Sequence, residues 1–231
     1  MHIEIWSDVV CPWCYLGKRR LEHALEDFEG KDQVTVTWRS FELDPNAPRE
    51  VEGDPLPPHE TPQAPFRGGP GVERLMAKYG MSRQQAEEGH ARLTRLAEAE
   101  GLEYHLDRTV PVNTFDAHRL TRLAAEHGLE SEAVERLFRA HFTEGMSIGR
   151  PENLSALFTE IGVPEAEIRE VLGGDGFAEQ VREEEALAAQ FGAQGVPFFV
   201  LDRRYALSGA QPREVFSAAL REAWEAGAGE K

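Results

Sequence analysis

Segments with strand-forming patterns occur only near the two ends of this chain, and this placement constrains the fold more than any other feature. Apolar residues alternate or form short runs in residues 3–7, 33–43, 196–202 and 205–209. Between residues 71 and 192, Leu, Ala and Phe instead recur at three- and four-residue spacing, which predicts helices. Each end is too small to bury a core of its own. The two ends should therefore combine into one sheet, with helices inserted between them.

The N-terminal patterns follow the order strand, helix, strand. A helical pattern runs from Cys14 to Phe28 and ends at Gly30. This order predicts a βαβ unit with a right-handed crossover. Near the other end, residues 202–204 predict a short hairpin turn, and Pro212 begins a final amphipathic helix.

Three parts of the chain follow from these patterns. We expect a sheet domain made of residues 1–45 and 176–231, and an all-helical insertion made of residues 71–175. Residues 46–70 form a proline-rich linker, since eight of the 14 prolines lie between residues 45 and 70. Proline lacks the N–H group that helices and sheets require. The predicted fold class is α/β.

Charge and hydropathy exclude several kinds of partner. The 231 residues carry a net charge of −16, which disfavours nucleic acid and anionic membranes. The first residues, MHIEIWSDVV, lack the basic and apolar regions of a signal peptide. No segment approaches the roughly 20 apolar residues needed to span a bilayer. We therefore expect a cytoplasmic protein with no membrane or nucleic-acid partner.

Both cysteines of the chain, Cys11 and Cys14, lie in the segment SDVVCPWCYLGKR, where the first strand pattern gives way to the first helix. The positive end of a helix dipole favours an anion, so this position should lower the pKa of Cys11. Pro12 suits the first helical position. Cys14 lies one turn further on, so a disulfide can form with little backbone movement. Cys11, at an exposed helix tip, is the predicted nucleophile, and Cys14 is the predicted resolving thiol.

Several functions are compatible with such a pair. Dithiol–disulfide exchange is favoured by the strand–CxxC–helix context, and a glutathione-using isomerase or transferase is the main alternative. A zinc site would need two histidines to complete four ligands, because no second CxxC is present, so we predict no metal. An inert structural pair is disfavoured in a reducing compartment. A non-enzymatic interaction protein that uses the helical insertion is a further alternative.

The ordered set of motifs resembles a known family. A strand, CPWC, a helix, a helical insertion and then QGVPFFV at 194–200 resemble the DsbA-type branch of the thioredoxin superfamily. SDVVCPWCYLGK, Asn113-Thr114, Ala117-His118 and QGVPFFV resemble its FrnE-like cytoplasmic members. The resemblance implies a thioredoxin-like fold with an all-helical insertion domain. Two features depart from the pattern: the dipeptide is Pro-Trp rather than Pro-His, and no second cysteine pair is present.

The resemblance also implies site residues. The Val196–Pro197 peptide bond should be cis and face the CxxC motif, and the backbone beside it should pair with an extended substrate. Trp13 should be partly exposed, either packing a ligand or packing on the helical insertion. A tryptophan cannot stabilise a thiolate by charge, so we expect a less oxidising pair than with histidine there. The predicted substrate-binding residues are Pro12, Trp13, Val196 and Pro197. The roles of Asn113 and His118 stay open.

We therefore predict a thiol–disulfide oxidoreductase, of the protein-disulfide oxidoreductase or isomerase kind, with Cys11 and Cys14 as catalytic residues. No cofactor is expected, although glutathione could be a redox partner. The partner would be a protein or small molecule that carries a disulfide or a dithiol. The related hydroxychromene-carboxylate isomerases and kappa-type transferases define the alternative, and they typically carry serine in place of Cys11. Sequence leaves the substrate, the direction of exchange and the oligomeric state open.

Overall fold

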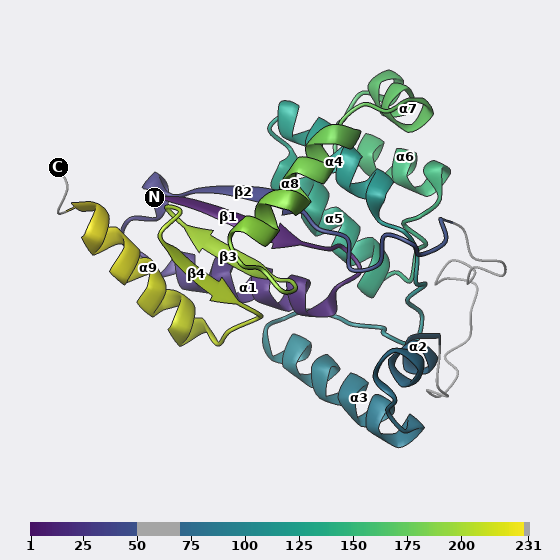
Figure 1. Cartoon of the computed structure of the whole chain (residues 1–231), viewed down its shortest axis with the longest axis horizontal. Coiled ribbons are helices and arrows are strands. Elements are labelled where there is room, and N and C mark those ends of the chain that lie inside the picture. Colours follow the sequence, from purple (N-terminus) through teal and green to yellow (C-terminus); the bar gives the residue numbers. More distant parts are fainter. Residues whose placement is uncertain (50–69, 229–231) are drawn as a thin grey trace. The chain divides into compact units, whose positions relative to one another are not determined.

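Residues from both ends of the chain form one sheet, as the sequence predicts. The computed structural model describes residues 1–49 and 70–228. Its four strands are β1 (His2–Ser7), β2 (Thr35–Ser40), β3 (Phe198–Leu201) and β4 (Tyr205–Ser208). The strand order is β2-β1-β3-β4, with β1 parallel to β2 and the other neighbours antiparallel (Figure 1). The predicted α/β class is confirmed.

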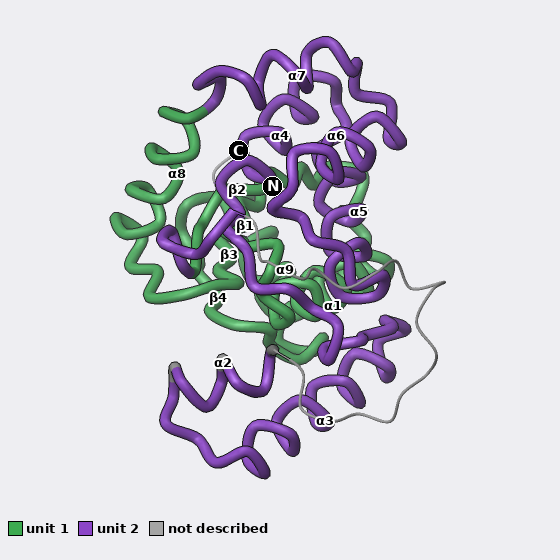
Figure 2. The backbone as a smooth tube through the Cα atoms, turned by 90° about the vertical axis from the view of Figure 1, so that its right-hand side faces the viewer, with its two compact units in different colours: residues 1–43, 178–231 green, residues 44–177 purple. Residues whose placement is uncertain are grey.

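The chain divides into two compact units. One unit contains residues 1–43 and 178–231, and the other contains residues 44–177 (Figure 2). The first unit holds all four strands, and the second holds six helices among the described residues. Of the linker predicted over 46–70, residues 50–69 lie outside the described part of the chain.

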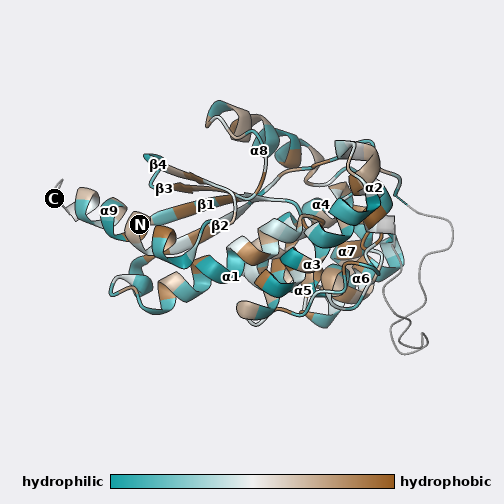
Figure 3. Ribbon diagram, turned by 90° about the horizontal axis from the view of Figure 1, so that it is seen from below, coloured by the Kyte–Doolittle hydropathy of each residue, from teal (hydrophilic) through white to brown (hydrophobic). Residues whose placement is uncertain are grey.

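Three helices cover the sheet of the first unit. α1 (Pro12–Glu26) and α9 (Arg213–Ala228) pack together on one face, and α8 (Ala178–Gln190) covers the other (Figure 3). Strand alternation divides the core between these faces. Phe199 meets Phe216 of α9 edge-on, with ring centroids 4.8 Å apart. On the opposite face, Trp6 packs with Ala188 of α8 and with Phe198 and Val200 of β3. A 3₁₀ turn, Lys31–Gln33, precedes β2.

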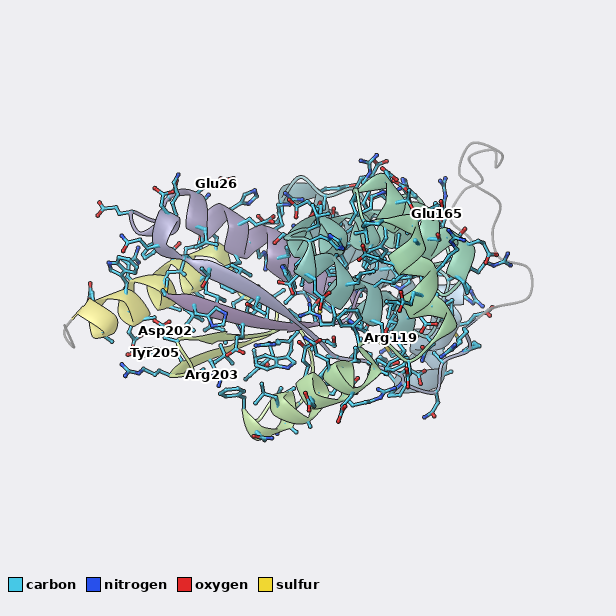
Figure 4. The ribbon with its side chains drawn as sticks, turned by 90° about the horizontal axis from the view of Figure 1, so that it is seen from above. Glu26, Arg119, Glu165, Asp202, Arg203 and Tyr205 are labelled. Carbon is cyan, nitrogen blue, oxygen red and sulfur yellow. The ribbon has the colours of Figure 1, made fainter. Side chains whose placement is uncertain are left out.

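The second unit is helical, as the spacing predicts. Its helices are α2 (Pro70–Tyr79), α3 (Arg83–Ala99), α4 (Phe115–Glu126), α5 (Glu130–Phe142), α6 (Pro151–Glu160) and α7 (Glu165–Gly173). Ser82 and Gln85 form a capping box at the start of α3. Arg119 of α4, labelled in Figure 4, donates hydrogen bonds to the carbonyls of Val171, Gly174 and Gly176. This arginine therefore ties the end of α7 to α4.

Several element boundaries differ from the sequence patterns, most clearly in α1 and β2. Helix α1 begins at Pro12 and ends at Glu26, earlier than the pattern over residues 14–28. Strand β2 ends at Ser40, although apolar residues continue to Leu43. The backbone N–H of Glu42 donates to Glu185 Oε1 at 3.0 Å, and that of Leu43 donates to Asp8 Oδ2 at 2.7 Å. Side-chain acceptors thus take the place of the backbone acceptors that a neighbouring strand would supply, and β2 ends at Ser40.

A buried carboxylate, Glu4, lies in the middle of β1 and is 1% exposed. Arg39 Nη2 donates to Glu4 Oε1 at 2.8 Å, and Arg203 Nε donates to Glu4 Oε2 at 2.9 Å. Arg203 and Asp202 belong to the predicted turn between β3 and β4, and Figure 4 labels both, together with Tyr205, the first residue of β4. Burial alone would raise the pKa of Glu4, but the hydrogen bonds from Arg203 and Arg39 lower it below its usual value.

The Glu4 cluster should make stability depend on pH. A carboxyl whose pKa is lower in the folded state stabilises the protein above its unfolded pKa, about 4.3, and the contribution disappears as the pH falls through the folded pKa. We expect Glu4→Gln to lower the free energy of unfolding by about 2 kcal/mol at pH 7 and by much less near pH 3. Urea denaturation at both pH values tests this. Glu222→Gln, at an exposed position of α9, is the control and should change little at either pH.

Candidate functional site

The CPWC motif lies at the start of α1, where the sequence predicts it. Cys11 is the N-cap residue with extended backbone angles (φ −92°, ψ 109°), and Pro12 is at the start of the helix. The Cys11 N–H donates to the Asp8 carbonyl at 3.0 Å, and the Cys14 N–H donates to the Cys11 carbonyl at 2.9 Å. The turn after β1 therefore places both sulfur-bearing residues within the first helical turn.

Both cysteines are free thiols, and both are buried. The predicted exposed position of Cys11 is wrong, because its exposed fraction is 4%, against 1% for Cys14. The Cys11 thiol donates a hydrogen bond of 3.6 Å to the carbonyl of Val196. That contact accounts for part of the burial. It also brings together two predicted site residues that are far apart in sequence.

The segment facing Cys11 contains a cis peptide bond between Val196 and Pro197, as the family resemblance implies. Strand β3 begins directly after this bond, at Phe198. The Gly209 N–H, just beyond β4, donates to the Pro197 carbonyl at 2.8 Å. One end of the sheet therefore holds the proline turn in place. This turn and the CPWC motif belong to the same compact unit.

Gly17, one turn after Cys14, was not predicted as part of the site. A Cβ atom at Gly17 would lie 3.1 Å from Cγ of Pro197 and 3.2 Å from Cζ of Phe199. These distances are tighter than ordinary packing, so glycine allows α1 to approach the proline turn closely. The glycine in CYLGK is visible in the sequence, but its partner is identified only by the fold.

The two thiols differ in their surroundings. Burial raises the pKa of Cys14 well above its usual value, and the neighbouring Cys11 raises it further. The backbone N–H of Asp8 and the side chain of Ser7 act in the opposite direction. Cys14 is therefore a protonated thiol at neutral pH.

Asp8 precedes the cysteines and is 1% exposed. Its carboxylate accepts hydrogen bonds from the N–H of Val10 at 3.3 Å and from the N–H of Leu43 at 2.7 Å. These contacts make the Asp8 carboxylate a cap for the turn that precedes α1. Asp8 thereby ties the CPWC turn to the residues that follow β2.

Trp13 is 42% exposed and lies at the second position of α1. Its partial exposure agrees with the prediction, and Pro12 beside it is partly buried. Trp13 therefore offers an aromatic surface next to the thiols. It lies in the same compact unit as the Val196–Pro197 turn.

Asn113 and His118 belong to the other unit. The Asn113 side chain donates to the Pro45 carbonyl at 3.0 Å and accepts from the Phe115 N–H at 3.0 Å. Asn113 thus fixes the segment that enters α4. His118 lies on α4 and is buried. Among the described residues, no group of three or more His, Cys, Asp or Glu side chains is arranged to hold a metal ion.

Comparison with known families shows to which family the chain belongs. The model of the DSBA-like thioredoxin domain matches residues 2–221. The chain belongs to this family. The predicted DsbA-type resemblance and thioredoxin-like fold are thereby confirmed, whereas the FrnE-like branch stays a prediction. Within residues 1–49 and 70–228, none of the helices of this DSBA-like protein is both long and apolar enough to cross a bilayer.

Solved structures with the same fold include close and distant relatives. The probable DsbA oxidoreductase SCO1869 from Streptomyces coelicolor is 44% identical, with a TM-score of 0.86, over 97% of this chain and 90% of that one. The cytosolic disulfide reductase DsbM from Pseudomonas aeruginosa, solved with glutathione, is 20% identical, with a TM-score of 0.63. The match covers 97% of this chain and 100% of that one. A 2-hydroxychromene-2-carboxylate isomerase is 17% identical, with a TM-score of 0.71, over the whole of both chains. The family membership and the likeness to SCO1869 both support an oxidoreductase-type enzyme.

The raised pKa of Cys14 predicts an order of reactivity. With iodoacetamide at pH 7, Cys14 in a Cys11→Ser variant should react at least about ten-fold more slowly than Cys11 in a Cys14→Ser variant, because only the thiolate reacts. The Cys14 rate should then rise about ten-fold per pH unit up to pH 9. Mass spectrometry of the alkylated protein measures both rates. Equal rates at pH 7 would contradict the assignment.

The close approach at Gly17 predicts an unusual response to alanine. In an open helix, glycine to alanine adds up to about 1 kcal/mol of stability, and Gly89 of α3, with no atom within 4 Å of its added Cβ, should behave in this way. Gly17→Ala should instead lower the free energy of unfolding by about 1–2 kcal/mol, since Pro197 and Phe199 must move. Urea denaturation of both variants tests this. A similar gain for both would show that the contact is not tight.

Proposed function

We propose that this DSBA-like protein is a thiol–disulfide oxidoreductase that uses the CPWC dithiol, with Cys11 as nucleophile and Cys14 as resolving thiol. The observation that carries the proposal is the 3.6 Å contact between the Cys11 thiol and the Val196 carbonyl, beside the cis bond to Pro197. A substrate sulfur that approaches Cys11 would also meet the backbone of this turn. Burial raises the pKa of Cys14 well above its usual value, so Cys14 is a protonated thiol until the resolving step.

The reaction has two balanced steps. The Cys11 thiolate attacks one sulfur of a substrate disulfide, which forms a mixed disulfide and releases the other substrate sulfur as a thiolate. The Cys14 sulfur then loses its proton and attacks Cys11. The Cys11–Cys14 disulfide forms, and the second substrate sulfur leaves and takes up a proton. The reverse sequence oxidises a substrate dithiol.

Substrate binding would involve Trp13, Pro12 and the Val196–Pro197 turn. The exposed ring of Trp13 supplies apolar area beside the sulfur pair. The backbone next to the cis bond would pair with an extended substrate segment, as an added strand does. A protein or small molecule with a disulfide or dithiol fits this arrangement, and a cytoplasmic setting suits reversible use of the pair.

Glutathione is the proposed redox partner, because the related fold of DsbM was solved with glutathione. A glutathione-dependent isomerase or transferase is the second candidate function. The fold shared along the full length with 2-hydroxychromene-2-carboxylate isomerase favours it. The two candidates differ in their need for Cys14, since an isomerase or transferase reaction does not require a resolving thiol.

Trapping separates the two candidates. Cys14→Ala, incubated with oxidised glutathione, should accumulate a stoichiometric mixed disulfide on Cys11, because the resolving step is lost. The Cys11→Ser variant should reduce disulfides at least about 100-fold more slowly than the wild-type protein. Mass spectrometry without reductant detects the adduct, and a dithiol reagent should remove it. Wild-type protein, treated in the same way, is the control and should yield the internal disulfide. Full turnover of glutathione with a small electrophile by Cys14→Ala would instead establish the isomerase or transferase reaction.

A further inference from the structure

The helical unit contains a pocket of about 520 Å³, lined by α3 and by residues 104–107. This volume is within the range of sites that hold small molecules. The described lining residues all belong to the unit of residues 44–177, so the pocket shares no side chain with the CPWC motif or the Val196–Pro197 turn. The proposed thiol–disulfide chemistry gives this pocket no role.

The walls of the pocket are mostly apolar, and buried neighbours hold them in place. Tyr104 and Leu106 are each 5% exposed, and the Tyr104 ring stacks on Phe142 with centroids 5.1 Å apart. A Cβ atom at Gly71 of α2 would lie 2.9 Å from Cε1 of His90 and 3.2 Å from the Leu106 carbonyl oxygen, so α2 packs closely against these two residues. Fixed apolar walls need little reorganisation to accept an apolar ligand.

Among the described residues, the charged side chains that line the pocket are all acidic. Glu87 and Glu88 come from α3, and Asp107 comes from the segment after that helix. Glu88 accepts a hydrogen bond of 2.9 Å from the uncharged Gln84, and the half-exposed Arg83 lies 3.9 Å from Glu87. Within the described part of the chain, no hydrogen bond or ion pair involves the Asp107 carboxylate. The pocket therefore carries an excess of negative charge.

His90 also lines the pocket but adds no positive charge. Burial lowers the pKa of His90 below its usual value, and Asp107 acts in the opposite direction. The imidazole is therefore neutral at pH 7.5. An anionic ligand would meet like charge in this pocket, whereas a cation would exchange water for carboxylate partners.

We propose that this pocket is a binding site for a small organic cation, an amine with an apolar body. The ammonium group would bind the carboxylates of Glu88 and Asp107, and the apolar body would pack on Tyr104 and Leu106. A charge-assisted hydrogen bond to a carboxylate is about twice as strong as a neutral one. The site should therefore select amines over acids and over uncharged analogues of the same shape. The inference does not depend on the proposed oxidoreductase function.

Three indole probes of similar size test which charge the pocket selects. Tryptamine is a cation at pH 7.5, tryptophol is its uncharged analogue, and indole-3-propionate is an anion. Isothermal titration calorimetry at low ionic strength should give a Kd below about 1 mM for tryptamine. Tryptophol should bind at least about ten-fold more weakly, and indole-3-propionate should not bind.

Variants test whether the amine binds in this pocket. Asp107→Asn and Glu88→Gln each remove one carboxylate and keep the side-chain size, so each should weaken tryptamine binding about three- to ten-fold. Glu170→Gln, at an exposed position of α7 outside the pocket, removes the same charge from the same unit and is the matched control. Its Kd should stay close to that of the wild-type protein. Ala91→Trp, at an exposed lining position of α3, should fill the pocket and abolish binding of tryptamine and tryptophol.

Three results would each overturn the site. Equal Kd values for tryptamine and tryptophol would show that charge does not select the ligand. Tryptamine binding that survives in Ala91→Trp, or that weakens as much in Glu170→Gln as in Asp107→Asn, would show general attraction to an acidic surface. The absence of tryptamine binding to the wild-type protein would refute the site directly. Far-UV circular dichroism of each variant checks that the helices are intact.

Discussion

The antiparallel pairing of β1 with β3 is the interaction on which the rest of the structure depends. It joins Ile5 to Phe199 and Trp6 to Phe198, residues near opposite ends of the sequence. The CPWC turn follows β1, and the cis-proline turn precedes β3. Because β1 and β3 run in opposite directions, the end of β1 and the start of β3 lie at the same end of the sheet. The contact between Cys11 and Val196 follows directly from this register.

The two faces of the sheet have different electrostatic character. On the α8 side, charges are paired: Glu4 binds Arg39 and Arg203, and Arg39 also binds Glu184 at 3.1 Å. On the α1 side, next to the sulfur pair, the groups that interact with Cys14 are a thiol, a hydroxyl and a backbone amide. Uncharged donors shift acidity moderately, whereas a buried cation would shift it strongly. Burial and the neighbouring Cys11 together raise the pKa of Cys14, so this thiol is protonated at neutral pH.

Membership of the DSBA-like family establishes the scaffold, and the site determines the chemistry. The distant neighbours show how broadly the scaffold is used, since a disulfide reductase and a chromene-carboxylate isomerase share it with this chain along nearly all or all of its length. Because the fold alone does not decide the chemistry, the residues at the tip of α1 and in the turn that faces it carry the argument for this chain. In this chain, those positions carry two thiols, an exposed tryptophan and a close glycine contact.

The sequence by itself determined the strand and helix segments, because periodicity and turn chemistry are local properties. It also predicted Cys11 and Cys14 as the reactive pair, since two cysteines close together at a strand–helix junction are visible without a fold. Only the tertiary structure decided that Cys11 is buried against Val196, that Gly17 meets Pro197, and that β2 stops at Ser40. Each of these depends on atoms that come from segments distant in the sequence. A pattern within one segment carries no information about the partner that another segment will supply.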